Sequence, residues 1–149
     1  MGGEETPVLR DLSLSIAPGT FTCVMGPSGS GKSTLLHIVA GLEQASAGKI
    51  VLEGRDVGEL GDRERTLLRR DAVGLVFQFF NLLPHMTVEE NVALPLWIAG
   101  QDKAQVGRRV DELLALLGLE DRRGHRAHQL SGGEMQRASI ARSLAPRPR

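Results

Sequence analysis

The residue types that most directly suggest chemistry lie in one glycine-rich stretch, residues 26–33, which reads GPSGSGKS. It fits the pattern G-x-x-x-x-G-K-S/T, a loop that binds nucleotide phosphates. Glycines let successive backbone N–H groups point at one anion, and the following helix adds its positive dipole. Lys32 is expected to reach the β- and γ-phosphates, and the Ser33 hydroxyl to bind Mg²⁺. The predicted phosphate-binding residues are Gly26, Pro27, Ser28, Gly29, Ser30, Gly31, Lys32 and Ser33.

A surface turn rich in glycine and serine is the alternative for this stretch. The flanking sequence favours the phosphate loop. Residues 21–25 are mostly apolar, as in a strand, and residues 32–40 are apolar enough for a buried helix that ends at Gly41. A strand, a loop and a helix in this order form the context in which the pattern binds phosphate.

A second predicted helix start also carries groups that suit an anion. Ser131 and Glu134 form the capping-box pattern S-x-x-E, with Gly132 and Gly133 between them. Helix capping alone explains these residue types. A hydroxyl, unobstructed backbone N–H groups and a helix dipole also make an anion site. This site and the phosphate loop can hold one nucleotide if they face each other, in one chain or across two copies arranged head to tail.

Gln78 follows residues 73–77, an apolar segment predicted to be a strand. Ligands in open α/β sheets collect at the carboxyl ends of strands, where an amide can contact a metal-bound water or a phosphate oxygen. The alternative is a polar residue that merely ends a strand. The next loop, residues 79–86, is apolar and contains Pro84. Its side chains belong either to the core or to a docking surface, and the residue types alone leave both open.

The rest of the chain is predicted to contain both strands and helices. Strands are predicted at residues 12–16, 21–25, 50–52 and 73–77, with the first two as a hairpin or as sequential strands. Helices are predicted at residues 32–40, 62–70, 87–99, 106–117 and 131–144. A capping box of Thr87 and Glu90 opens the third of these helices, and Gly118 ends the fourth.

Composition excludes several classes of function. The chain has 149 residues with 18 Lys and Arg against 18 Asp and Glu, so it lacks the positive charge of a dedicated nucleic-acid-binding protein. Its 41% apolar residues are sufficient for a packed core. The one cysteine, Cys23, excludes an internal disulfide. No apolar stretch is long enough to span a membrane, and the acidic residues 1–7 argue against a secretory signal.

The order of these motifs resembles one family. The phosphate loop, a glutamine after an apolar strand, and residues 130–137, LSGGEMQR, have the order and spacing of the ATP-binding cassette (ABC) ATPases. The resemblance covers nearly the whole chain, from residue 8 to residue 145. Residues 77–84, FQFFNLLP, and residues 90–96, ENVALPL, are similar to the branch that serves lipoprotein release and macrolide export. Chromosome-maintenance ATPases share the signature motif, but they interrupt it with long coiled coils that this sequence lacks.

The resemblance implies an α/β fold of the P-loop NTPase class and the ABC ATPase type, present in part. The implied parts are N-terminal antiparallel strands, a phosphate-loop core and a helical subdomain, with the C-terminal part of the core sheet outside the chain. Residues 1–78 would be the N-terminal part of the nucleotide-binding core. Residues 79–130 would be the helical subdomain, and residues 131–149 the signature motif and the helix after it.

The resemblance also implies a role for each motif. Residues 26–34, which add Thr34 to the phosphate loop, match the Walker A loop that holds ATP with Mg²⁺. Gln78 matches the Q-loop glutamine, which contacts Mg²⁺ or the attacking water and responds to a transmembrane permease docked at residues 79–86. The residues that match the signature motif, which caps the γ-phosphate of ATP held by a second copy, are Ser131, Gly132, Gly133 and Glu134.

The implied protein is the ATP-hydrolysing subunit of an ABC transporter. It would pair head to tail with a second copy and drive a membrane permease. Its implied location is cytoplasmic, peripheral on the inner face of the plasma membrane through the permease.

The chain departs from the family pattern at both ends. A Walker B strand ending in Asp-Glu is expected just after residue 149, and neither it nor the D-loop and switch histidine beyond it occurs in the sequence. Glu120 and Asp121 are a poor substitute for the Walker B pair. They stand in the reverse order, Glu-Asp, and the segment before them is the end of an amphipathic helix that stops at a glycine, not a strand. The aromatic residue that stacks on adenine, expected before residue 8, is also missing.

These departures support an alternative, a truncated and non-hydrolysing fragment that binds nucleotide or permease. The strands that should flank the phosphate-loop strand are not expected in the chain. Because strands of a parallel sheet are normally covered on both faces, exposed apolar sheet surface is expected.

Overall fold

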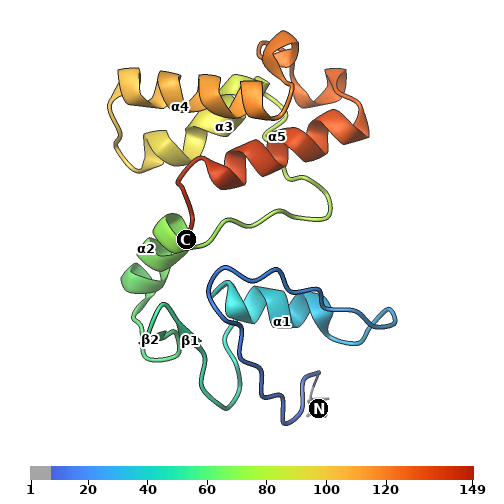
Figure 1. Ribbon diagram of the computed structural model, residues 1–149, viewed down its shortest axis with the longest axis vertical. Coiled ribbons are helices and arrows are strands. Elements are labelled where there is room, and N and C mark those ends of the chain that lie inside the picture. The colour runs from blue at the N-terminus through green and yellow to red at the C-terminus, as the bar shows by residue number, and fades with distance from the viewer. Residues whose placement is uncertain (1–7) are drawn as a thin grey trace, which may run out of the picture. The chain divides into compact units, whose positions relative to one another are not determined.

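The computed structural model describes residues 8–149 (Figure 1). Residues 1–7, whose acidic composition argued against a secretory signal, lie outside the described residues. The chain divides into two compact units, the first ending at Gly61 and the second covering Asp62–Arg149. The phosphate loop belongs to the first unit, and Gln78 and Ser131 belong to the second.

Helix α1, Lys32–Val39, and a short hairpin form the regular part of the first unit. Gly41 ends α1 at a positive φ of 70°, and the Leu42 N–H donates to the His37 carbonyl at 2.8 Å. The hairpin pairs β1, Val51–Leu52, with β2, Arg55–Asp56, through a turn with positive φ at both central residues. The helix and the short strand were both predicted from the sequence.

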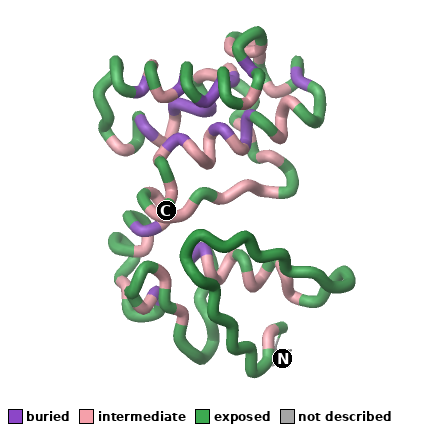
Figure 2. The backbone as a smooth tube through the Cα atoms, viewed as in Figure 1, coloured by how far each residue is buried: buried purple, intermediate pink, exposed green. Residues whose placement is uncertain are grey.

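Three predicted strands, residues 12–16, 21–25 and 73–77, do not form ladders in the described part of the chain, so these three strand predictions are wrong. A strand needs a neighbour to accept its backbone hydrogen bonds, and the pair β1–β2 is the one sheet within residues 8–149. The first two segments run exposed, with Phe21 97% and Met25 86% accessible (Figure 2). Apolar side chains are exposed here as expected, but on irregular chain and not on the surface of a sheet.

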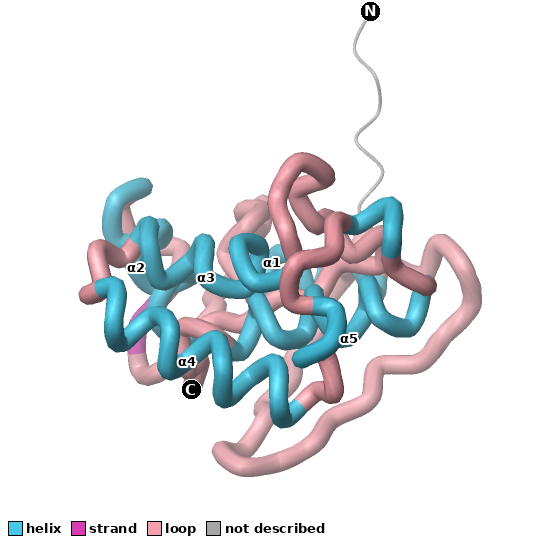
Figure 3. Tube along the Cα trace, turned by 90° about the horizontal axis from the view of Figure 1, so that it is seen from above, coloured by secondary structure: helices cyan, strands magenta, loops and turns pink. Residues whose placement is uncertain are grey.

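The second unit is helical. Its helices are α2, Asp62–Ala72, α3, Val88–Ile98, α4, Lys103–Leu116, and α5, Gly132–Leu144. The connector between α4 and α5, residues 117–131, contains two 3₁₀ turns. These are η1, Glu120–Arg122, and η2, Ala127–Gln129. Helices α3, α4 and α5 pack against one another (Figure 1, Figure 3). All four helices were predicted, with ends within a few residues of those observed.

Local signals explain where these helices begin and end. Thr87 caps α3 and Ser131 caps α5, and both predicted capping boxes form with the glutamates three residues later. Asp102, which the sequence reading missed, caps α4 by accepting from two backbone N–H groups. Gly118 follows α4 at a positive φ of 61°, as expected for a helix-ending glycine.

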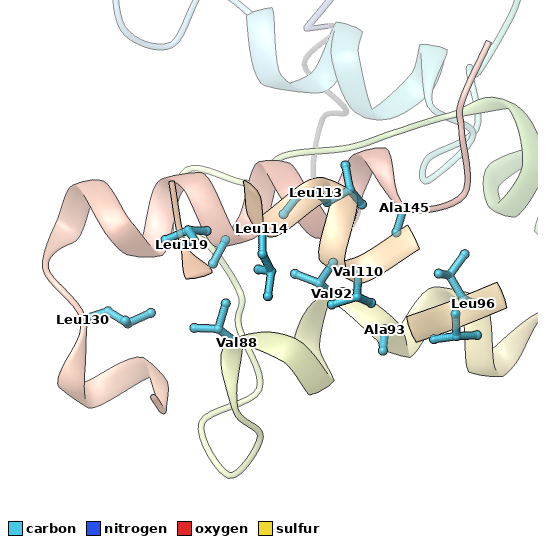
Figure 4. Close-up of a cluster of buried hydrophobic side chains, with 13 residues drawn as sticks. Val88, Val92, Ala93, Leu96, Val110, Leu113, Leu114, Leu119, Leu130 and Ala145 are labelled. Atoms are coloured by element: carbon cyan, nitrogen blue, oxygen red, sulfur yellow. The ribbon is translucent and has the colours of Figure 1, made fainter. Parts of the chain in front are cut away.

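The core of the second unit joins α3, α4, α5 and the connector (Figure 4). Its fully buried members include Val92 from α3, Leu114 from α4 and Ala141 from α5. Alanines on the inner face of α5 let the helices approach closely. The buried hydrophobic residues of this cluster are Val88, Val92, Ala93, Leu96, Val106, Val110, Leu113, Leu114, Leu119, Leu130, Ala138, Ala141 and Ala145.

Candidate functional site: a phosphate loop, a signature helix and the Gln78 turn

The phosphate loop has the backbone geometry that its glycines predict. Gly29 and Gly31 have positive φ angles of 79° and 86°, a conformation that residues with a Cβ rarely adopt. Gly31 is the N-cap of α1 and offers no side chain to cap it. The first-turn N–H groups of α1 are therefore not capped by a side chain, so the helix start is suited to an anion.

Side-chain atoms lie close to the positions that a Cβ would occupy on two of these glycines. A Cβ on Gly31 would lie 2.8 Å from Leu9 Cδ2, and a Cβ on Gly26 would lie 2.9 Å from Ser30 Oγ. Both of these atoms are ends of side chains, which can rotate away from an added Cβ. The requirement for glycine is therefore conformational and applies to Gly29 and Gly31, where φ is positive.

Lys32 folds back over the phosphate loop. Its Nζ donates to the carbonyls of Gly26 at 3.0 Å and Pro27 at 2.7 Å, and lies 3.3 Å from Ser30 Oγ. The ammonium is therefore held where it faces the inside of the loop. Phosphate oxygens are stronger acceptors for an ammonium than neutral carbonyls.

The second candidate anion site is the start of α5. Ser131 Oγ accepts from the Glu134 N–H at 3.3 Å, and Glu134 Oε2 accepts from the Ser131 N–H at 2.8 Å. Gly132 and Gly133 are exposed, and a Cβ on Gly132 would meet nothing within 4 Å. Neither glycine has a positive φ. The packing and conformation of this chain therefore do not explain the two glycines, and the backbone at the start of α5 is open to solvent.

Glu134 carries strong electrostatic stabilisation. Hydrogen bonds from the Ser131 N–H and hydroxyl, followed by the Arg122 guanidinium at 2.8 Å, lower its pKa from 4.5 to about 2. The charged carboxylate is thus the form that holds the N-cap and ties α5 to η1.

The free energy of unfolding is expected to depend on Glu134 in acid. Because its folded pKa lies below its ordinary value, its contribution is present above about pH 4.5 and is lost as the pH falls towards 2. Glu134→Gln is expected to show a smaller loss of stability than wild type over that interval. Urea unfolding at several pH values measures the difference. Glu120→Gln is the control, because its exposed carboxylate lies in η1, the turn that Glu134 contacts through Arg122. Equal pH profiles for wild type and Glu134→Gln would contradict the assignment.

Gln78 lies in an exposed turn of the second unit. The Phe80 N–H donates to the Phe77 carbonyl at 3.1 Å and closes the turn. Helix α5 holds the turn: Ser139 Oγ donates to the Phe80 carbonyl at 3.1 Å, and Arg142 donates to the carbonyls of Phe80 and Asn81 at 3.0 and 2.7 Å. The turn after Gln78 is therefore bound to the helix that begins at Ser131.

The loop over residues 79–86 has both exposed and core-packed side chains. Phe79 is 82% exposed, whereas Leu82 packs against the buried core. Asn91 of α3, which the sequence reading missed, is 1% exposed and fixes the loop from beneath. Its side chain accepts from the Leu83 N–H at 2.7 Å and donates to backbone carbonyls of the loop. The sequence gives no clear signal for such a buried clamp, because Asn91 directly follows Glu89 and Glu90 at the polar start of α3.

Other features of the described residues assign no additional site. Within residues 8–149 no group of three or more His, Cys, Asp or Glu side chains is placed to hold a metal ion. Glu120 and Asp121 lie in a 3₁₀ turn rather than at the end of a strand, consistent with their rejection as a Walker B substitute. No helix in the described part of the chain has the length and apolarity to cross a membrane.

Known proteins place these features in a family. The family model described as ABC transporter matches residues 9–149. The chain is 50% identical over 145 residues to the lipoprotein-releasing system ATP-binding protein LolD 2 of Caulobacter vibrioides, covering 97% of this chain and 64% of that protein. It is 54% identical over 138 residues to the macrolide export ATP-binding/permease protein MacB of Marinobacter nauticus, covering 93% of this chain and 21% of that protein.

A solved structure agrees. The ATP-binding cassette MJ0796, a dimer in a post-hydrolysis state bound to ADP and Pi, matches with a TM-score of 0.88 and 41% identity over 95% of this chain and 62% of that one. This chain therefore belongs to the ABC transporter family. The predicted P-loop fold of ABC type and the predicted branch are confirmed. The chain spans slightly less than two thirds of the length of the lipoprotein-releasing relative.

Proposed function

We propose that this chain is the ATP-binding part of an ABC transporter subunit that couples nucleotide binding to a membrane permease. The observation that carries the proposal is the phosphate loop: a glycine-capped helix start with the Lys32 ammonium turned onto the loop. Family membership and relatives named as ATP-binding proteins support it.

In this proposal residues 26–34 hold the ATP phosphates. Backbone N–H groups of the loop and of the first turn of α1 bind phosphate oxygens. Lys32 exchanges its carbonyl partners for β- and γ-phosphate oxygens. The hydroxyls of Ser33 and Thr34 lie on the first turn of α1. Ser33 suits Mg²⁺, because Mg²⁺ prefers oxygen ligands and is usually coordinated by one or two protein groups together with substrate phosphates. Gln78 is proposed as a further contact to the metal or its water.

The start of α5 is proposed to bind the γ-phosphate of ATP held by a second copy. Ser131 supplies a hydroxyl, and Gly132 and Gly133 leave the backbone open to an approaching phosphate. Glu134 keeps the cap in place. Glycine is less favourable than alanine in a helix by up to about 1 kcal/mol, so two glycines without an internal packing reason support a role in binding. The dimeric state of MJ0796 supports pairing of two copies.

We extend the proposal to a transporter of the lipoprotein-release or macrolide-export type. The permease would dock near residues 79–86, where Phe79 is exposed, and the subunit would lie on the inner face of the plasma membrane. Residues 1–149 contain no apolar strand followed by Asp-Glu. The proposed contributions of this chain to the reaction are therefore binding and clamping of ATP, with the attacking water activated by an acid that these residues do not supply.

Nucleotide selectivity tests the proposal. The loop and Lys32 recognise β- and γ-phosphates, so the chain is expected to bind ATP and ADP with Mg²⁺ and to bind AMP at least about tenfold more weakly. Isothermal titration calorimetry with each nucleotide measures this order. Equal affinity for AMP and ATP, or no heat with any nucleotide, would overturn the proposal.

A further inference from the structure

The carbonyls after Gln78 have an unusual set of donors. Phe80 and Asn81 both have positive φ angles, of 60° and 50°, a conformation that is unfavourable for a residue with a Cβ. Their two consecutive carbonyls receive three hydrogen bonds from α5: one from Ser139 and two from Arg142. The partners are 59 to 62 residues apart in sequence. A strained turn next to the glutamine that is proposed to contact the nucleotide is thus held by one helix, which is distant in the sequence but adjacent in the structure.

Packing does not account for these two polar side chains. Ser139 is fully buried among alanines of α5 and uses its hydroxyl on the Phe80 carbonyl. Burial lowers the pKa of Arg142 from its ordinary value, yet the guanidinium spreads its donors over two neighbouring carbonyls. An apolar residue would fill the same space without desolvating a charge. The choice of donors therefore points to control of the turn.

The segment before Gln78 meets the same helix. A Cβ on Gly74 would lie 2.8 Å from the Ser143 carbonyl. The backbone on both sides of Gln78 is therefore in contact with the last turns of α5 or hydrogen-bonded to them.

Helix α5 is fastened at both of its ends. At the start, the Ser131–Glu134 capping box and the Arg122–Glu134 ion pair hold the first turn. At the end, Arg109 donates to the Leu144 carbonyl at 2.7 Å. The 13 residues between form a continuous helix about 20 Å long. A displacement at Ser131 would be carried to Ser139 and Arg142 by this continuous helix.

We infer that Arg142 and Ser139 are positioning residues that tie the Gln78 turn to helix α5, so that engagement of Ser131 by a ligand is transmitted to Gln78. The tie itself stands on the hydrogen bonds above. The transmission rests on the proposed function, in which Ser131 binds phosphate. Because coupling between sites is reciprocal, a partner that moves the Gln78 turn would also alter ligand binding at Ser131.

Amide hydrogen exchange of the 149-residue chain tests the tie without nucleotide. Arg142→Met keeps the length of the side chain and removes its donors. It is expected to speed exchange at residues 80–83 by about tenfold to a hundredfold, the effect of losing hydrogen bonds to a charged group. Arg142→Lys, which keeps one donor group, should restore part of the protection. Arg108→Met, at an exposed arginine of α4, is the control and should leave these amides unchanged.

A merely structural role would change exchange throughout the helical unit. The core amides of α3 and α4 and the urea midpoint are therefore measured on the same samples. Unchanged exchange at residues 80–83 in Arg142→Met, or an equal rise across α3 and α4, overturns the inference. If Arg142→Met does not fold, Ser139→Ala supplies the same test with the loss of one donor, and unchanged exchange there also overturns it.

Saturating Mg-ATP tests the transmission. In wild type, ATP-dependent pairing is expected to change exchange at residues 80–83, and Ser131→Arg, which blocks pairing, should remove that change. Arg142→Met should also remove it, and calorimetry on the same samples establishes the ATP concentration that saturates this variant. If wild type binds ATP and Arg142→Met retains the full ATP-induced change, the transmission is wrong and the proposed function stands. If wild type binds no ATP, the proposed function and the transmission fail together. Hydrogen exchange measured without nucleotide still tests whether Arg142 and Ser139 hold the Gln78 turn.

Discussion

Replacing Lys32 by alanine is expected to weaken ATP binding by about a hundredfold, because a hydrogen bond to a charged group contributes about 1.5–3 kcal/mol. The ammonium already faces the loop interior through its bonds to the carbonyls of Gly26 and Pro27. Its removal takes away the one positive side chain of the phosphate-loop stretch, residues 26–34. Calorimetric titration of Mg-ATP into each variant gives the dissociation constants.

A control must show that the loss of affinity depends on the position of Lys32 and not simply on the loss of one positive charge. Lys49→Ala removes the same side chain from the same unit, at a residue whose ammonium lies 3.5 Å from Asp56. It is expected to leave ATP affinity within about twofold, since the median exposed ion pair contributes little. Lys32→Arg keeps the charge but not the shape of the donor, so it should also weaken binding. An unchanged affinity in Lys32→Ala, with circular dichroism confirming the fold, would refute the assignment of the phosphate loop.

The helices of this chain could be predicted from sequence because their determinants are local. The capping boxes at Thr87 and Ser131 and the ending glycines at Gly41 and Gly118 each act within one turn of their helix. The predicted strands depended on something else. Residues 12–16 and 21–25 have the apolar pattern of strands, but a ladder needs a neighbouring strand, and the described residues supply none.

The candidate site also contains some residues that local sequence patterns predict and others that they do not. The proposed phosphate-binding residues and the Ser131 cap follow from short patterns in which each residue type has a local reason. Asn91 and Arg142 could not be found in this way, because both act on backbone carbonyls. A carbonyl is present at every residue and leaves no signature in the sequence, and the partners of Arg142 lie more than 60 residues away. Tertiary structure is needed to bring such a donor to its acceptors.

Ser131→Arg is expected to leave ATP affinity of the single chain unchanged and to block ATP-dependent pairing of two copies. The phosphate loop belongs to the other compact unit of the chain, so its own contacts to ATP are not altered. At α5, the substitution removes the hydroxyl that accepts from the Glu134 N–H and places a long side chain beside the two open glycines. Light scattering after size-exclusion chromatography, with and without Mg-ATP, measures pairing, and calorimetry measures affinity.

Loss of a helix cap is the competing explanation, and Thr87 provides its control. Thr87 caps α3 with the same capping box, so Thr87→Arg costs a comparable amount of helix stability, about 0.5–2 kcal/mol. If Ser131 is merely a cap, both variants should lose stability and neither should lose pairing selectively. If Ser131 binds phosphate, the two variants should be similarly destabilised in urea while pairing is lost in Ser131→Arg alone. Pairing that persists in Ser131→Arg would therefore assign Ser131 to helix capping and remove the start of α5 from the nucleotide site.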